Sequence, residues 1–133
     1  MRASSPGSRM RETGEGWREI EVDGYRILVG KSATDNDRLT FGVGRPNDLW
    51  LHAAGCAGSH VIVQMPDGTE QVPRPVVDRA AELAAFYSKA REASGKVAVH
   101  VCRVAEVRKE RGAPPGEVRL RRYRAVKAYP RGA

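Results

Sequence analysis

Hydrophobic and polar residues alternate along several short segments of this chain, and the alternation predicts a sheet. Residues 17–22 and 25–29 flank Asp23-Gly24, the two-residue signal of a tight hairpin. Over residues 96–107, valines occupy every second position at the start of the segment. This spacing predicts a strand with one buried face.

Three further segments read as strands. Residues 48–53 and 60–64 are apolar runs, separated by a loop of small residues at 54–59 that allows close approach of a ligand or another strand. In the last strand region, 118–129, alternate positions hold apolar residues at first, and the same alternate positions then hold arginines. A bulge or break near Arg121-Arg122 resolves this conflict.

Two segments are expected to be helical. Residues 76–93 carry alanines and valines at helical spacing, and their wide alanine-rich face suits close packing on a sheet. A short helical turn is expected near residues 35–42. Three residues before or within it are suited to cap its start: Ser32, Thr34 and Asp35.

These elements predict an α+β fold, with a mostly antiparallel sheet, the 76–93 helix packed on one face and a short helical turn near 35–42. Residues 1–16 are rich in Ser, Gly, Arg and Glu without hydrophobic periodicity, so we expect a disordered tail there. Order is expected to begin near Trp17, with a single domain over residues 17–130.

The cysteines and the apolar runs bear on the cellular location of the protein. The two cysteines, Cys56 and Cys102, have neither the spacing of a zinc site nor the density of a disulfide scaffold, which favours a reducing, cytoplasmic location. No apolar run approaches the roughly 20 residues that span a bilayer. We expect no membrane association, no metal and no cofactor.

The net charge of +7 is concentrated at one end of the sequence. Residues 1–102 hold 13 basic and 13 acidic side chains, whereas residues 103–133 hold ten basic and three acidic ones. A localised excess attracts polyanions through phosphate contacts and counterion release, so nucleic acid is the first partner to consider. The alternative is that these arginines decorate the solvent face of edge strands and deter aggregation.

The chemically distinctive side chains gather between residues 35 and 64. Two histidines, His52 and His60, flank the small-residue loop, where they suit either hydrogen bonds to backbone carbonyls or contacts to RNA. Asp37 and Asp48 each follow an asparagine, a pattern typical of turns and caps. Trp50 suits the core, or base stacking if its face is exposed.

Four blocks resemble one family in the same order along the chain: NDRLTFGVGRPNDLWLHAAGCAGSHVIVQ, RAAELAAFYSKARE, KVAVHVCRVAEVRK and RGAPPGEVRL. They are similar to the C-terminal R module of the NFACT family, which includes ribosome-quality-control factors and proteins once described as fibronectin-binding. The likeness covers about residues 25–130. Departures include Lys31 to Asp35 in place of an Asn-rich approach, and Ala57 in place of the usual proline before Gly-Ser-His.

The resemblance implies a role in RNA binding. Longer family members join other modules to the R module and bind a blocked large ribosomal subunit, so the resemblance implies rRNA or tRNA, and that subunit, as partners. We expect a stand-alone R module here, with any further NFACT modules supplied by a separate protein. The residues expected to contact RNA are Asn36, Asp37, Asp48, Trp50, His52, Ser59, His60, Arg108, Lys109, Arg119, Arg121, Arg122 and Arg124.

Three classes of function remain at this point. The leading one is a non-catalytic RNA-binding module, with phosphate contacts from the arginine-rich C-terminal strands and a more selective contact from the loop between His52 and His60. The second is an RNA- or phosphoester-directed enzyme that uses these histidines with Asp37 or Asp48. The third is an adaptor that binds protein on the ribosome.

Overall fold

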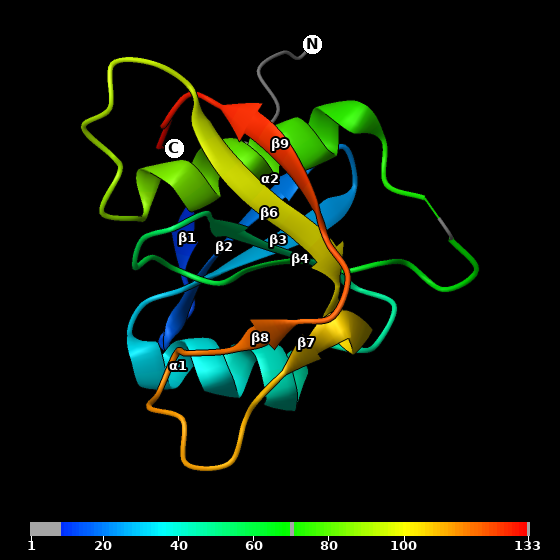
Figure 1. The fold of residues 1–133 in the computed structure, drawn as a ribbon. Coiled ribbons are helices and arrows are strands. Elements are labelled where there is room, and N and C mark those ends of the chain that lie inside the picture. Colours follow the sequence, from blue (N-terminus) through cyan, green and yellow to red (C-terminus); the bar gives the residue numbers. More distant parts are fainter. Residues whose placement is uncertain (1–8, 70, 133) are drawn as a thin grey trace, which may run out of the picture.

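The computed structural model describes residues 9–69 and 71–132, and in these ranges it is an α+β fold built on an antiparallel sheet (Figure 1). The main sheet has seven strands in the order β1-β2-β3-β5-β4-β6-β9, and every neighbouring pair is antiparallel. Its strands are β1 (Arg11–Glu12), β2 (Trp17–Val22), β3 (Tyr25–Gly30), β4 (Leu49–Ala53), β5 (Val61–Val63), β6 (Val97–Arg103) and β9 (Arg124–Ala128). The predicted fold class is confirmed.

The first hairpin follows directly from its turn residues. β2 and β3 pair from Trp17 opposite Gly30 to Val22 opposite Tyr25. Asp23 and Gly24 both have positive φ angles, 51° and 84°, as a two-residue hairpin turn requires. The hairpin that Asp23-Gly24 predicts is therefore present in the expected register.

One face of the sheet is covered by helix α2 (Arg74–Phe86). Its buried valines, alanines and leucine pack on apolar residues of β3, β4, β5 and β6, including Val29, Leu51, Val61 and Val99, and form the larger core cluster. Val97, Val99 and Val101 all point into this cluster, as their alternation predicts. No helix in the described ranges is long and apolar enough to cross a membrane.

The predicted bounds of this helix, 76–93, are wrong at both ends. It begins at Arg74, after Pro73 at the N-cap, and Pro75 lies at its second position, where the fixed φ of proline suits the helix and no backbone donor is needed. It ends at Phe86, since Tyr87 leaves helical geometry and the backbone of residues 87–89 bonds to the loop at 57–59 instead. The helical spacing of the sequence continues past the point where this long-range pairing stops the helix.

The opposite face is covered by a second, smaller layer (Figure 1). Helix α1 (Ala33–Arg38) runs into a π-helical turn, η2 (Leu39–Val43), which confirms the helical segment near 35–42. The Ser32 hydroxyl caps α1 by accepting a hydrogen bond from the Asp35 N–H at 3.1 Å. A 3₁₀ turn and a small two-stranded sheet complete the layer: η3 (Val104–Glu106), β7 (Val107–Arg108) and β8 (Arg119–Leu120).

The smaller core cluster lies between this layer and the sheet. It consists of Trp17, Leu28, Leu39, Trp50, Ile62, Cys102, Val104 and Val107. The break predicted near Arg121-Arg122 is confirmed, because β8 belongs to the small sheet and β9 to the large one, with residues 121–123 between them. The chain thus uses the break to pass from one sheet to the other.

Order begins earlier than the sequence predicts. β1 pairs with β2, placing Arg11 opposite Glu19, so the expectation that order starts near Trp17 is wrong for these residues. An ion pair between the Arg11 guanidinium and the Glu19 carboxylate at 2.9 Å lies across the same pair of strands. Residues 1–8 of the predicted tail lie outside the described residues.

Candidate nucleic-acid interface

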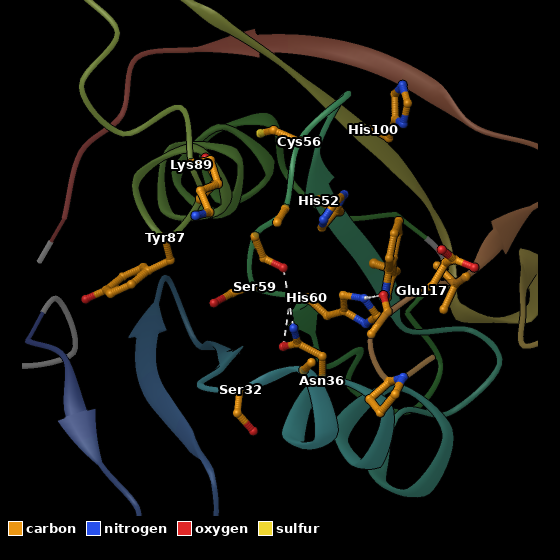
Figure 2. A pocket seen from close by; sticks show the side chains of 18 of the residues that line it. Ser32, Asn36, His52, Cys56, Ser59, His60, Tyr87, Lys89, His100 and Glu117 are labelled. Carbon is orange, nitrogen blue, oxygen red and sulfur yellow. Dashed lines mark hydrogen bonds between the residues drawn. The ribbon is translucent and has the colours of Figure 1, made fainter. Parts of the chain in front are cut away.

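A groove of about 1040 Å³ opens on the sheet face opposite α2, beside the layer formed by α1 and the small sheet. Its walls come from four places in the sequence: the start of α1, the loop at 56–60, the residues after α2, and the loop at 114–118. Figure 2 shows His52 and His60 near its middle, with Lys89 and Tyr87 toward one side and Glu117 toward another. The groove therefore gathers segments that are far apart in the chain.

The floor of the groove is aromatic. His52 on β4 lies directly opposite His100 on β6, and the His100 ring lies 4.4 Å from the ring of Tyr123. Tyr123 is 56% exposed, and both histidine side chains are partly exposed. Burial, then the neighbouring His100, lower the pKa of His52, although a hydrogen bond with the Gly58 backbone opposes them. His52 is therefore neutral at physiological pH.

The rim of the groove is cationic. Arg18, Lys31, Lys89 and Arg91 line it, and among the described lining residues Glu117 is the one acid. Arg18 and Lys31 share the exposed carboxylate of Glu12. Lys89 and Arg91 have no ion-pair partner within the described part of the chain, although Arg91 lies 4.0 Å above the Phe86 ring. The rim thus offers uncompensated positive charge.

The Gly-Ser-His sequence holds the wall of this groove in place. Gly58 pairs with Ser88 in an isolated antiparallel bridge, and a Cβ at Gly58 would lie 2.7 Å from the Ser88 Cβ, so only glycine allows this approach. The Ser59 hydroxyl donates to the Gly30 carbonyl at 2.6 Å. Ser59 is therefore occupied in tying the loop to β3.

His60 is buried and forms the centre of a chain of hydrogen bonds. Its Nε2 lies 3.1 Å from the Gly116 carbonyl, which can only accept, so Nε2 carries the proton. Its Nδ1 then accepts from the Thr40 hydroxyl at 2.8 Å, and that hydroxyl accepts from the Trp50 indole N–H at 3.2 Å. Both ring nitrogens are satisfied in the neutral form.

The electrostatics agree with a neutral ring. Burial, then the nearby His52, lower the pKa of His60 to about 4, while its contact with Gly116 and the charge of Asp37 act in the opposite direction. His60 is thus a neutral, structural imidazole. Its contacts match the alternative in which these histidines form hydrogen bonds to backbone carbonyls and hold the loop in place.

The pair Asn36-Asp37 braces two loops at once. The Asn36 side chain is buried, accepts from the His60 backbone N–H at 3.0 Å and donates to the Gly58 carbonyl at 3.4 Å. Asp37 accepts from the Gly116 N–H at 3.1 Å and pairs with the Lys109 ammonium at 2.9 Å. One residue therefore holds the loop before β5, and the next holds the loop before β8.

Three more predicted contact residues are engaged by other parts of the fold, and two of them are buried. Asp48 is 1% exposed, and its carboxylate accepts from the backbone N–H groups of Arg45 and Met65, both at 2.9 Å. Trp50 is also 1% exposed, so the condition for stacking on a base, an exposed face, is not met. Lys109 donates to the carbonyls of Pro114 and Glu117 as well as to Asp37. These side chains support the groove from within.

A second cavity of about 670 Å³ lies beside the first, and Leu120 lines both. Its cations are Arg108, Lys109, Arg111, Arg119 and Arg121, against the single acid Glu110 among the described lining residues. Arg119 pairs with Glu110 at 3.1 Å. Arg122 and Arg124, which follow Arg121 in the sequence, are exposed. The C-terminal arginines thus extend the cationic surface of the groove.

Sequence reasoning missed part of the rim. Lys31, Lys89 and Arg91 come from residues 1–102, in which the charges cancel, so the charge distribution along the sequence gives no sign that they gather. In the sequence, His100 is only one position in the alternating pattern of a strand, yet it forms part of the floor of the groove. Among the described residues, no three His, Cys, Asp or Glu side chains gather as a metal site would require.

An α+β module with a cation-rimmed aromatic groove and an adjoining arginine-rich cavity has the features of a nucleic-acid-binding domain. The sequence matches the family described as NFACT protein RNA binding domain over residues 17–122. The chain therefore belongs to that family, and the family resemblance read from the sequence is confirmed.

Several relatives are similar over most of this chain. It is 39% identical to the Rqc2 homolog RqcH of Bacillus subtilis over 97 residues, which cover 73% of this chain and 16% of the relative. The Rqc2 homolog RqcH of Streptococcus suis is 38% identical over 85% of this chain and 20% of its own length. The Drosophila melanogaster ribosome quality control complex subunit NEMF homolog is 32% identical over 74% of this chain and 10% of its own.

A solved structure shares the fold. The C-terminal part of the fibronectin/fibrinogen-binding protein from Streptococcus suis superposes with a TM-score of 0.79 at 34% identity, covering 91% of this chain and 47% of that one. This chain spans a fifth or less of the length of the curated relatives above. What those whole proteins do is therefore a starting point for a proposal about this one.

Proposed function

We propose that this chain is a non-catalytic RNA-binding module that contacts rRNA or tRNA at the ribosome. The observation that carries the proposal is the pair of cavities that share Leu120, because in each the cations outnumber the single acid among the described lining residues. A strand of RNA that crosses Leu120 would meet positive charge on both sides. Phosphate contacts of this kind supply most of the affinity of RNA-binding surfaces.

The arrangement of the arginines favours an anionic partner. Arg108 and Arg119 lie directly opposite each other in the small sheet, and like charges in that position oppose strand pairing. Glu110 offsets only part of this repulsion, through its ion pair with Arg119. A bound phosphate would neutralise the remaining repulsion between the two arginines. Arginines that only kept an edge strand soluble would not require such a partner.

The contacts of the polar side chains argue against catalysis. Both ring nitrogens of His60 are engaged, and its lowered pKa makes it a weak base at neutral pH. Asp37 and Asp48 are held by backbone N–H groups. Burial, then the charge of Glu106, raise the pKa of the Cys102 thiol to about 12, so it is a poor nucleophile.

The ribosomal context comes from the relatives. Three of them are named as RqcH or as a ribosome quality control complex subunit. We infer that this module works at a ribosome, with the large subunit as its partner and the cytoplasm as its location.

The test is the salt dependence of RNA binding. Binding of tRNA and of purified large subunits is measured over a series of salt concentrations for the wild type and for the double variant Arg121→Gln/Arg122→Gln. Each lost phosphate contact lowers the slope of log affinity against log salt by about 0.7–0.9, so we expect the double variant to be shallower by about 1.5. An unchanged slope and affinity would remove the C-terminal arginines from the interface.

A matched control removes two arginines elsewhere. Arg11 lies on β1, at the sheet edge opposite β9, and Arg74 lies at the start of α2, and both are exposed and ion-paired. The variant Arg11→Gln/Arg74→Gln has the same net charge as the test variant, and its slope should stay near that of the wild type. Crosslinking and sequencing of bound RNA in cells, with both variants, then identifies the RNA.

A further inference from the structure

We propose that the groove holds an unpaired RNA segment, with one base stacked on the ring of Tyr123 beside His100 and its phosphates on Lys89 and Arg91. This inference rests on the proposed function and adds the class of RNA and the site of base contact. It assigns a role to aromatic and basic residues that the fold does not need for its core.

The stacking surface is the exposed aromatic pair. Tyr123 is 56% exposed, has no place in either core cluster and lies in the stretch between β8 and β9. Its ring lies 4.4 Å from the His100 ring, tilted by 45°, so His100 supports one side of it. A large aromatic ring held at a groove wall without being buried is the arrangement on which unpaired bases stack.

The phosphate contacts lie on the rim. Lys89 and Arg91 follow α2 and carry no ion pair among the described residues, so a phosphate would be their first counter-charge. The bridge between Gly58 and Ser88, with the bond from the Lys89 N–H to the Ala57 carbonyl at 2.9 Å, fixes the backbone that carries them. Figure 2 shows Lys89 and His100 on different sides of His52.

The shape of the groove favours an unpaired strand over a duplex. In A-form RNA the bases are stacked inside the helix, so a side-chain ring on the floor of a groove reaches only splayed or single-stranded bases. A volume of about 1040 Å³ is at the upper end of the range for sites that enclose small ligands, which suits one or two nucleotides. Four cations against one acid along the described lining favour RNA over a protein segment of mixed charge.

The experiment compares matched oligoribonucleotides. A short single strand with one 2-aminopurine, and the same strand annealed to its complement, are titrated with the full chain, and both affinity and 2-aminopurine fluorescence are recorded. We expect the single strand to bind more tightly and its fluorescence to be quenched. Tyr123→Leu should weaken the binding by about 5- to 150-fold, the range for one base stacked on an aromatic ring.

Two variants separate stacking from other effects. Tyr123→Phe keeps the ring and should bind as the wild type does. Tyr129→Leu removes another exposed tyrosine, 44% exposed, which lies just beyond β9, outside the residues that line the groove, and it should have no effect. Since Tyr123 and Tyr129 are both exposed, neither leucine variant should unfold the protein.

The outcomes distinguish this inference from the function on which it rests. Equal binding of duplex and single strand, or unchanged binding and quenching in Tyr123→Leu while the salt slope remains, overturns the stacking site and leaves RNA binding intact. If the wild type binds no RNA but is retained by the proteins extracted from purified large subunits, the partner is protein, and both proposals fall.

Discussion

The stability of this protein should fall as the solution is acidified, and His60 should account for much of the fall. The pKa of the His60 ring is lowered from the ordinary value of 6.5 to about 4, mainly because burial disfavours the charged imidazolium. Between these two pH values the unfolded chain binds a proton that the folded chain does not. The contribution is therefore fully present above pH 6.5, falls as the pH drops, and levels off below about pH 4.

The size of the effect follows from the two pKa values. A difference between 6.5 and about 4 corresponds to about 3 kcal/mol of unfolding free energy, at about 1.36 kcal/mol for each factor of ten in proton affinity. The assay is urea unfolding at a series of pH values, for the wild type and for His60→Gln. We expect the variant to be less stable than the wild type at neutral pH. Between pH 6.5 and pH 4, the unfolding free energy of the variant should fall by up to about 3 kcal/mol less than that of the wild type.

A direct titration of the ring makes the test independent of whether the variant folds. In a long-range ¹H–¹⁵N spectrum of the wild type, the His60 ring should carry its proton on Nε2 at neutral pH and should start to titrate only near pH 4. A ring that titrates near pH 6.5, or that is protonated on Nδ1, would refute the reasoning. It would also restore His60 as a candidate base.

Two further predictions concern the same scaffold. Thr40→Val should lower the unfolding free energy by about 2–4 kcal/mol, because it leaves the buried His60 Nδ1 and Trp50 indole N–H without a partner. Urea unfolding measures this, and Thr40→Ser, which keeps the hydroxyl, should recover most of the loss. Lys109→Met should speed exchange of the amide hydrogens of Ala113, Gly116 and Glu117 by about tenfold, since the ion pair with Asp37 and two carbonyl contacts are lost. Exchange in the seven-stranded sheet should stay unchanged, and equal protection of this loop in both proteins would contradict the bracing role.

The end of α2 shows where sequence periodicity stops being informative. Alanines and tyrosine continue at helical spacing beyond Phe86, so the pattern predicts a helix to residue 93. Gly58 and the residues around it offer backbone partners to residues 87–89, and the chain takes these contacts in place of another helical turn. A helix end is set by such competition, and one of the competitors lies about thirty residues away.

The motif residues make the same point about the site. Asn36, Asp37 and His60 are recognisable in the sequence as turn, cap or ligand-type residues. Their partners are not, since the Gly116 carbonyl that His60 contacts lies 56 residues further along the chain. These residues therefore brace the loops that form the groove, and the cations on its rim come from positions with weaker sequence signals.

The sequence by itself determined the alternating strands, the Asp23-Gly24 turn, the break after β8, the C-terminal charge excess and the family. These depend on local period, turn chemistry and composition, which neighbouring residues specify. Only the tertiary structure decided that Lys31, Lys89 and Arg91 share a groove with Tyr123. The physical reason is that the sheet order and two long-range loop contacts place these residues together, and both depend on pairing between segments distant in the chain.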